Sequence, residues 1–513
     1  MSVRFVPRFG AVVVALGILV GCGGPPSLDD AAEAASEWPL AGIDIPPVED
    51  SVASDGLAVE GAGPNLEQGS TGETETGPPL ERPETDMDAT GPMIHTPPGF
   101  TDFPDARFPR PEHVRGLYVN AWAAGSHERM TRLLDIARRT EVNSLVIDIK
   151  DATGYISHET EVALAHEIGA TEERRIRDLP ALLDRLEAEG IYPIARIVVV
   201  KDPILSTFRP ELAVQDTAGG LWMDGKESLW LNPFSEEMWA YHVEIAREVA
   251  EIGFPEIQWD YVRFPDAPQS ELDRAVFAGR EGRERVDAIR GFLVYVRDAL
   301  SDLPVRSTID VFGVTTSFRR DVGIGQLWET FIDVVDVALP MVYPSHYWEG
   351  SFGIEDPNGH PYEIVRAALN NVVRRSAAVE SAGLTRPWLQ DFSLGEPIYG
   401  AAEVRAQIQG VYDAGIQEWI LWNPGARYTE AALEPVGGFE REPLVRVAGL
   451  LTPVSRRQLV IDSVAALPVP TDSLPSTGDV VPDTATVRSD TLPPSLPVDT
   501  ISPVERQSPR EPL

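Results

Sequence analysis

The chain is poor in cysteine, lysine and histidine. Among its 513 residues there are one cysteine, three lysines and eight histidines, whereas arginine occurs 40 times. A single cysteine excludes a disulfide within the chain and any multi-cysteine metal site. Basic residues are also few in total, 43 against 80 acidic ones, so that the net charge is −37. This balance argues against nucleic acid as a partner, because phosphate backbones are bound through Lys and Arg.

The one cysteine, Cys22, stands at the end of a short export signal. Two arginines precede an apolar run of about ten residues, whereas a membrane-spanning helix needs about 20. The run ends in LVGC, which resembles the bacterial lipobox, a motif whose cysteine is lipidated. We therefore predict a signal peptide over 1–21 and a lipid anchor to the cell envelope at Cys22; a signal peptide with an incidental cysteine is the alternative. Gly23 stands where inner-membrane lipoproteins usually carry Asp, which favours the outer membrane or the periplasmic face.

Composition sets two further segments apart. Residues 23–100 contain 16 acidic residues and one basic residue, and the 61 residues from 453 onward contain 11 prolines and no aromatic residue. Such sequences bury too little apolar surface to offset the entropy lost on ordering. We predict a disordered acidic, Pro/Gly-rich tether over 22–105 and a disordered Pro/Ser/Thr-rich tail over 453–513. Contact of the tail with the envelope or cell wall is its alternative role.

Between these segments, residues 106–452 alternate short apolar runs with helical patterns. Helices are predicted to begin after Ser126, Asp178 and Ser235, which are N-capping residue types, and to end near Gly190 and Gly253. Strands buried on both faces read as continuous apolar runs, and eight βα units predict an α/β fold, the (β/α)8 TIM barrel. A doubly wound open sheet is the alternative, but no Gly-rich phosphate loop follows the first strand. The predicted strands are 114–122, 144–151, 192–200, 256–265, 305–313, 335–344, 386–393 and 418–425.

Two aspartates interrupt apolar strands near their C-terminal ends, where the catalytic residues of TIM barrels lie. Asp260 belongs to the fourth predicted strand and Asp310 to the fifth. An unpaired buried carboxylate is costly, so each must be paired or retained for chemistry. Glycoside hydrolysis requires two carboxylates facing one cavity, one as acid and the other as nucleophile or base. We predict Asp260 and Asp310 as this catalytic pair; an ion pair of Asp260 with Arg196 or Arg263 is the structural alternative.

Further polar and aromatic residues fall at the same predicted end of the barrel. Sugar rings have apolar C–H faces that stack on aromatic rings, although core packing is the commoner fate of any single aromatic residue. The three lysines, Lys150, Lys201 and Lys226, also fall there, and an ion-pair network around Lys150 is the structural alternative for its neighbouring aspartates. We predict as substrate-binding residues Asp148, Lys150, Asp151, Tyr118, Trp122, Lys201, Trp230, Tyr261, Arg263, Tyr343, Asp391, Trp422 and Asn423.

Motifs for cofactors are missing from the sequence. The histidines are scattered without HExxH or His-x-His spacing, and the GxSxG elbow of serine hydrolases does not occur. We therefore predict no cofactor and no metal. Four strand-end aspartates leave a hard cation as the alternative.

Several stretches of the barrel resemble a known family. They are RGLYVNAW, NSLVIDIKDATGYI, the block from WLNP to EIQWDYVRFP, TIDVFG, LPMVYPSHY and WILWNPGARY. Over about 113–430 the chain resembles the bacterial glycoside hydrolase family whose barrel was first catalogued as a domain of unknown function. The resemblance implies a hydrolase in which Asp260 is the fourth-strand carboxylate and Asp310 its preferred partner. Pro255 and Trp259 depart from the family's usual Asp and Phe, but they lie outside the DYVRFP core. The resemblance supplies no substrate.

Three functions remain open at the level of the sequence. The first is a lipid-anchored glycosidase that cleaves an envelope or extracellular polysaccharide. The second is a barrel without turnover that binds envelope polysaccharide, and the third is a metal-assisted hydrolase or deacetylase built on the same carboxylates. Residues 101–452 hold 56 acidic and 35 basic residues, which favours a neutral or cationic glycan over a polyanion.

Overall fold

The computed structural model describes Phe103 and residues 106–465. The predicted signal peptide, the lipidation site Cys22, most of the predicted tether and the chain beyond 465 lie outside the described residues. No helix within the described part is long and apolar enough to cross a membrane.

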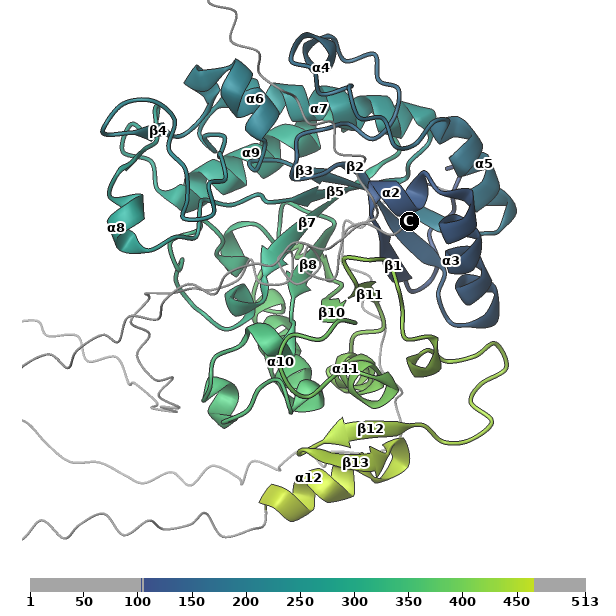
Figure 1. Ribbon diagram of the computed structural model, residues 1–513. Coiled ribbons are helices and arrows are strands. Elements are labelled where there is room, and N and C mark those ends of the chain that lie inside the picture. The colour runs from purple at the N-terminus through teal and green to yellow at the C-terminus, as the bar shows by residue number, and fades with distance from the viewer. Residues whose placement is uncertain (1–102, 104–105, 466–513) are drawn as a thin grey trace, which may run out of the picture. The chain divides into compact units, whose positions relative to one another are not determined.

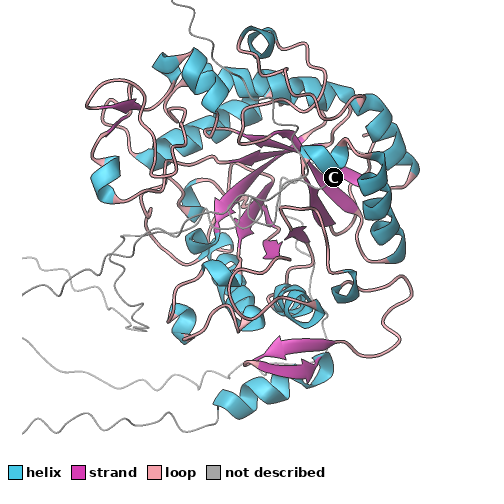
Figure 2. Ribbon diagram, in the orientation of Figure 1, coloured by secondary structure: helices cyan, strands magenta, loops and turns pink. Residues whose placement is uncertain are grey.

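A closed ring of eight parallel strands forms the centre of the molecule. The strands are β1 (Arg115–Val119), β2 (Ser144–Lys150), β3 (Tyr192–Val198), β5 (Glu256–Asp260), β7 (Arg306–Phe312), β8 (Val337–Met341), β10 (Trp388–Gln390) and β11 (Trp419–Trp422). Their hydrogen-bonding order is β10-β11-β1-β2-β3-β5-β7-β8, and a pairing of β10 with β8 closes the ring. Each strand falls within a predicted range, and Figures 1 and 2 show the helices around them. The predicted (β/α)8 barrel is confirmed.

The ring closes through its shortest pairing. β8 meets β10 at one register position, Trp388 opposite Met341, whereas β7 and β8 share five. A separate two-residue strand, β9 (Leu384–Thr385), pairs with the start of β8. Pro387 stands between β9 and β10, and a proline has no N–H to donate to a ladder. The seventh predicted strand, 386–393, is therefore shortened to β10, and the preceding β9 pairs with β8 separately.

The helices cover the outside of the barrel. The predicted N-caps are confirmed, because the side chains of Ser126, Asp178 and Ser235 each accept a backbone N–H from the first turn. Gly253 ends α7 with a φ of 128°, a conformation that favours glycine. The longer helices are α3 (His127–Arg139), α5 (Leu179–Ala188), α7 (Glu236–Ile252), α9 (Arg285–Ala299), α10 (Pro361–Ser376) and α11 (Ala401–Asp413). Between β7 and β8 the chain forms two 3₁₀ turns, η2 (Gly313–Thr316) and η3 (Trp328–Thr330), in place of an α-helix.

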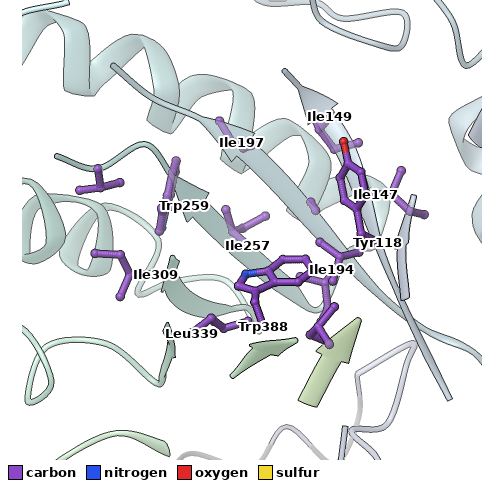
Figure 3. Close-up of a cluster of buried hydrophobic side chains, with 14 of the residues drawn as sticks. Tyr118, Ile147, Ile149, Ile194, Ile197, Ile257, Trp259, Ile309, Leu339 and Trp388 are labelled. Carbon is purple, nitrogen blue, oxygen red and sulfur yellow. The ribbon is translucent and has the colours of Figure 1, made fainter. Parts of the chain in front are cut away.

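Side chains alternate between the two faces of each strand, and β5 shows the pattern most clearly. Glu256, Gln258 and Asp260 point inward, where they bond to polar side chains of other strands at three levels of the barrel. Ile257 and Trp259 point outward and are fully buried under the helices, as Figure 3 shows. Burial of one such apolar side chain contributes about 1.5–3 kcal/mol. The outer faces thus stabilise the fold while the inner faces carry polar groups.

Two insertions at the C-terminal end of the barrel are joined to each other. One follows β3 and contains α6 (Pro203–Phe208), η1 (Pro210–Leu212) and β4 (Gln215–Asp216); the other follows β5 and contains α8 (Gln269–Leu272) and β6 (Ala275–Val276). β4 and β6 pair antiparallel. The Nε1 of Trp222 also donates to the backbone oxygen of Glu271 at 2.9 Å. A third insertion, after β2, contains α4 (Ala163–Glu167).

The ordered chain continues past the predicted domain boundary at 452. A hairpin of β12 (Leu444–Val447) and β13 (Leu450–Pro453) leads into α12 (Arg457–Ala465). Val445 and Val447 are fully buried and pack with Tyr362 of α10 and Ala406 of α11. Val454, Val460 and Ile461, which composition alone assigned to the tail, pack against this cluster.

Candidate active site

A cavity of about 280 Å³ opens among the C-terminal ends of the barrel strands. Both predicted catalytic aspartates line this cavity. The C-terminal end of the strands is also where the active sites of TIM barrels lie. Eight of the predicted binding residues line it as well: Tyr118, Trp122, Asp148, Asp151, Tyr261, Arg263, Tyr343 and Trp422.

Arg196 of β3 links the carboxylates at the base of this cavity. Its Nη1 donates to Oδ1 of Asp148 at 2.6 Å, and its Nε donates to Oδ2 of Asp260 at 2.9 Å, with Nη2 also bonded to that oxygen. The guanidinium is 5% exposed, so water screens these interactions little. Asp260 thus forms a direct ion pair with a buried arginine. The ion pair that the sequence offered as the structural alternative for Asp260 is therefore present, within the cavity itself.

Asp310 lies beside this network in different surroundings. Its Oδ1 accepts a hydrogen bond from Nε1 of Trp388 at 2.7 Å, and Nε2 of Gln258 donates to both carboxylate oxygens, at 2.9 Å to Oδ1 and 3.0 Å to Oδ2. Arg196 approaches Oδ2 of Asp310 only to 3.9 Å. Burial, and then the neighbouring charge of Asp260, raise the pKa of Asp310 well above its ordinary value. Asp310 therefore retains its proton to a higher pH than an exposed carboxyl group does.

A third carboxylate, Asp148 of β2, lies beside Arg196 in the lining of the cavity. The hydroxyl of Tyr118 donates to Oδ2 of Asp148 at 2.5 Å, and Arg196 holds the other oxygen. Burial raises the pKa of Asp148 to about 6, against the lowering effect of Arg196. Asp148 is thus a further titratable group that responds to pH in the slightly acidic range.

The chain turns sharply directly after Asp260. Tyr261 has a φ of 52°, in the left-handed region that non-glycine residues rarely adopt. This turn brings the Tyr261 N–H to Oδ1 of Asp260 at 2.6 Å. The oxygen that Arg196 leaves free is therefore held by the backbone, and backbone strain at functional sites is a recurrent way to fix a side chain.

Aromatic rings form one side of the cavity. Tyr118 stacks on Trp422 with ring centroids 4.0 Å apart, and Trp388 stands edge-on to Trp422 at 5.4 Å. At the rim, Trp122 is 50% exposed, while the guanidinium of Arg175 lies 4.8 Å from its ring centroid on one face. The Trp122 ring therefore has Arg175 on one face, and its exposed surface suits stacking with the apolar face of a sugar.

Five predicted binding residues lie elsewhere. Lys150 is fully buried, pairs with Asp202 at 2.8 Å and donates to the backbone oxygen of Val198. Asp391 accepts two bonds from Thr429 and so fixes the loop after β11.

Asn423 has the same role as Asp391, because it bonds to the backbone at Gly425 and Arg427 and donates to the backbone oxygen of Asp391. Lys201 and Trp230 line a second cavity, beside the first.

The sequence interpretation did not place several lining residues in the site. Arg196 was considered only as an ion-pair partner, although it interrupts an apolar strand as Asp260 does. Gln258 bonds to Asp310 without lining the cavity. It lies two residues before Asp260 and hence on the same strand face, a signal that was available in the sequence. His346 follows the end of the sixth predicted strand and carried that signal, whereas the approach of Trp388 to the cavity depends on how the barrel closes.

Within the described residues, no group of three or more His, Cys, Asp and Glu side chains is placed to hold a metal ion. The Asp148, Asp260 and Asp310 carboxylates surround a guanidinium instead.

Comparison with known proteins identifies the family. Residues 116–428 match the model of the family described as "Putative glycosyl hydrolase domain", and the chain belongs to this family. No curated protein matches the chain.

Solved structures with a similar chain include three bacterial proteins. A hypothetical protein from Ruminiclostridium thermocellum is 38% identical over 37% of this chain and 96% of its own, with a TM-score of 0.34. The PgaB (BpsB) glycoside hydrolase domain from Bordetella bronchiseptica is 14% identical over 61% of this chain and 95% of its own, with a TM-score of 0.44. The glycoside hydrolase domain of PelA from Pseudomonas aeruginosa is 13% identical over 62% and 97%, with a TM-score of 0.36.

Proposed function

We propose that this protein is a glycoside hydrolase that cleaves a neutral or cationic polysaccharide of the cell envelope or its surroundings. The observation that carries this proposal is the pair of carboxyl groups, Asp260 and Asp310, which face one cavity from neighbouring strands in different surroundings. Arg196 bonds to Asp260, whereas burial and the neighbouring Asp260 raise the pKa of Asp310. Such a difference in environment is how glycosidases divide the roles of acid and base between two carboxyl groups.

In the proposed reaction the two groups act on one glycosidic bond. Asp310 transfers its proton to the glycosidic oxygen as the bond from that oxygen to the anomeric carbon breaks. Asp260 either attacks the anomeric carbon or removes a proton from the water that attacks it. In the first case water then releases the sugar from Asp260, and Asp310 recovers a proton from that water. In the second case Asp260 ends protonated and Asp310 ends ionised, and proton exchange with solvent restores both groups. Each route consumes one water.

The remaining lining residues support this assignment. Arg196 holds Asp260 in one orientation without blocking the cavity, because it approaches from within the barrel. The stacked pair Tyr118 and Trp422 and the exposed ring of Trp122 offer flat apolar surfaces to sugar rings. Preorganised groups of this kind need not rearrange during the reaction.

We further propose that the enzyme is exported and anchored to the envelope through a lipid on Cys22. The LVGC motif after a short apolar run supports this placement. Growth with a radiolabelled fatty acid tests it, with Cys22→Ser as the control. Label in the wild-type chain that is lost in the variant is expected, and an unlabelled wild-type chain contradicts the anchor.

Hydrolysis is tested on the full chain purified in detergent. We would incubate it with neutral, deacetylated and uronic-acid polysaccharides and with peptidoglycan, and measure new reducing ends. Asp260→Asn and Asp310→Asn should abolish the product, whereas the surface variant Asp302→Asn, which removes an exposed partner of Arg247, should not. The anomer of the first product, read by NMR, separates attack by Asp260 from attack by water.

A binding role is the second candidate, and one observation favours it. Each oxygen of Asp148 and Asp260 already has a partner inside the protein, an arrangement that would also suit a rigid carbohydrate-binding barrel. Binding of a polysaccharide without any product would support this role. Loss of the product on adding EDTA would instead support a metal-assisted hydrolase.

A further inference from the structure

A second cavity, of about 220 Å³, lies next to the first at the same end of the barrel. Its walls come from the two joined insertions, and its lining contains three cationic and three carboxylate side chains. These are Lys201, Lys226, Arg263, Asp224, Asp266 and Glu271. Arg263 also lines the first cavity, so this side chain stands between the two.

The wall that Arg263 forms is rigid. Its guanidinium lies 4.8 Å from the ring centroid of Trp230, 5.0 Å from that of Tyr261 and 4.5 Å from that of Phe312. Its Nη1 also donates to the backbone oxygen of Phe264 at 3.1 Å. The two cavities therefore keep a fixed spacing, as successive sites for one chain molecule would require.

The opposite wall is a hairpin tip that is held in one conformation. Oδ1 of Asp224 accepts the N–H groups of Lys226 and Ser228, and its Oδ2 accepts Nε1 of Trp230 at 2.9 Å. This turn presents Lys226, which is exposed, at the edge of the cavity. The site is thus built before any ligand arrives.

Two carboxylate oxygens in the lining have unmet hydrogen-bonding capacity. Oδ2 of Asp266 and Oε2 of Glu271 are buried and accept no hydrogen bond. Such groups are rare in folded proteins because each costs free energy. Both side chains line the cavity, so rotation of the carboxylate brings these oxygens to a donor on a ligand.

The chemistry of the lining selects the ligand. A hydroxyl group donates to a carboxylate and accepts from an ammonium group, and this cavity offers both kinds of partner. The formal charges of the six side chains cancel, so neither an anionic nor a cationic sugar gains from the cavity as a whole. Its volume is below the roughly 300–1,000 Å³ of sites for drug-sized ligands, which suits a single ring.

We infer that the second cavity is a separate subsite that binds one neutral, hydroxyl-rich sugar unit of the polysaccharide whose neighbouring part occupies the first cavity. This inference rests on the proposed function, because it takes the ligand of the first cavity to be a glycan. In this subsite the hydroxyl groups of the sugar donate hydrogen bonds to Asp266 and Glu271 and accept one from Lys226.

The test measures how affinity depends on glycan length. Full chain carrying Asp260→Asn, which prevents turnover, is titrated with short and long neutral oligosaccharides of the types on a glycan array, beside uronic-acid and free-amine sets. We expect the long neutral members to bind at least tenfold more tightly than the short ones. Asp266→Asn, Glu271→Gln and the exposed-site change Lys226→Ala should each reduce this ratio severalfold. Asp273→Asn, on the same insertion but outside the cavity, should leave it unchanged.

The two proposals fail in different ways. An equal affinity for short and long neutral glycans overturns the second subsite even if the wild type releases product. A length preference confined to uronic-acid or free-amine glycans, or one that the three cavity variants do not change, also overturns it. A length preference that the variants abolish, in a chain that never releases product, supports the subsite and overturns the hydrolase.

Discussion

The two ends of the barrel each bury an arginine between carboxylates, yet they differ in what surrounds it. At the N-terminal end, Arg386 bonds to Glu256 at 2.6 Å and to Glu418 at 2.9 Å, and Arg110 covers Glu418 from outside. Arg386 and Glu256 are fully buried. The charges pair off there, and the pKa of Glu418 is lowered by the two arginines despite its burial.

At the C-terminal end, Arg196 faces more carboxylates than it can neutralise. Asp148, Asp260 and Asp310 all lie within its reach, and an open cavity adjoins them. The pKa values of Asp148 and Asp310 are raised rather than lowered. A buried arginine with carboxylates is therefore no sign of function by itself. The excess of carboxyl groups, and the space next to them, separate the active end from the structural end.

The largest effect is expected from Asp260→Asn. The variant loses the nucleophile or base, so kcat/KM on a polysaccharide substrate should fall by about 10⁴-fold. Its free energy of unfolding should change by no more than about 1 kcal/mol or rise, because active-site charges often reduce stability. Reducing-end assays and urea denaturation measure the two quantities. Activity that survives within tenfold would remove Asp260 from the mechanism.

At the opposite end, Arg386→Met should act on stability alone. It leaves Glu256 buried without its cation, and breaking a buried pair in this way costs about 3–5 kcal/mol. Activity per folded molecule should be unchanged. The matched control is Arg138→Met, which removes an exposed pair with Glu189 and should leave the denaturation midpoint nearly where it is. Equal denaturation midpoints for the two variants would refute the structural role of the charged residues around Arg386.

Asp310→Asn should change the pH dependence of the rate. In the wild type the rate should fall as pH rises through the raised pKa of Asp310, because the proton donor is lost. The variant should lack this alkaline limb and be about 10²–10³-fold slower on polysaccharide. On an aryl glycoside, whose leaving group needs little protonation, the loss should be much smaller. An alkaline limb that persists in Asp310→Asn assigns the acid to another group.

The smallest effect is expected in the pH dependence of the free energy of unfolding, which should run in opposite directions for Asp148 at the C-terminal end and Glu418 at the N-terminal end. Asp148 titrates near pH 6 in the folded chain and near about 3.9 when unfolded. The contribution of Asp148 to the free energy of unfolding is fully present below the unfolded pKa and is lost as the pH rises through 6. Asp148→Asn should therefore raise the free energy of unfolding at pH 7 by up to about 3 kcal/mol and leave it unchanged near pH 4.

Glu418 should show the reverse dependence. Its lowered pKa means that its contribution is present above the unfolded value and is lost as pH falls. Glu418→Gln should be less stable than wild type at pH 7, with the difference shrinking in acid. Thermal melts of both variants across this range check the contrast. A parallel response of the two variants would contradict it.

The barrel and its two central aspartates could be predicted because strand periodicity and burial act locally. An acidic residue in an apolar strand is visible in one sequence, and so is the capping residue of a helix. The same periodicity extends to Gln258, which lies on the face of Asp260. What it cannot give is the partner across the barrel, such as Trp388, whose position depends on ring closure.

Lys150 shows why a residue near the end of a strand need not face the cavity. The register between β2 and β3 shifts between Asp148 and Lys150, and the ammonium group turns toward Asp202 instead of the cavity. One extra residue in a strand moves every later side chain of that strand to the opposite face. Asp391 and Asn423 lie at strand ends too, but they hold the loop after β11. No pattern in the sequence separates a loop-holding polar residue from a ligand-holding one.

The closing pairing of the barrel has a consequence for the time at which activity arises. Trp388 both completes the ring opposite Met341 and donates the hydrogen bond to Asp310. A nascent chain that has formed the first six strands already contains Asp148, Arg196, Asp260 and Asp310, but Asp310 still lacks this donor. The complete donor set around Asp310 therefore forms only after the last two strands have been synthesised and docked. Under the proposed mechanism, a truncated or half-closed barrel lacks one of the donors that hold its acid and should not cleave glycan.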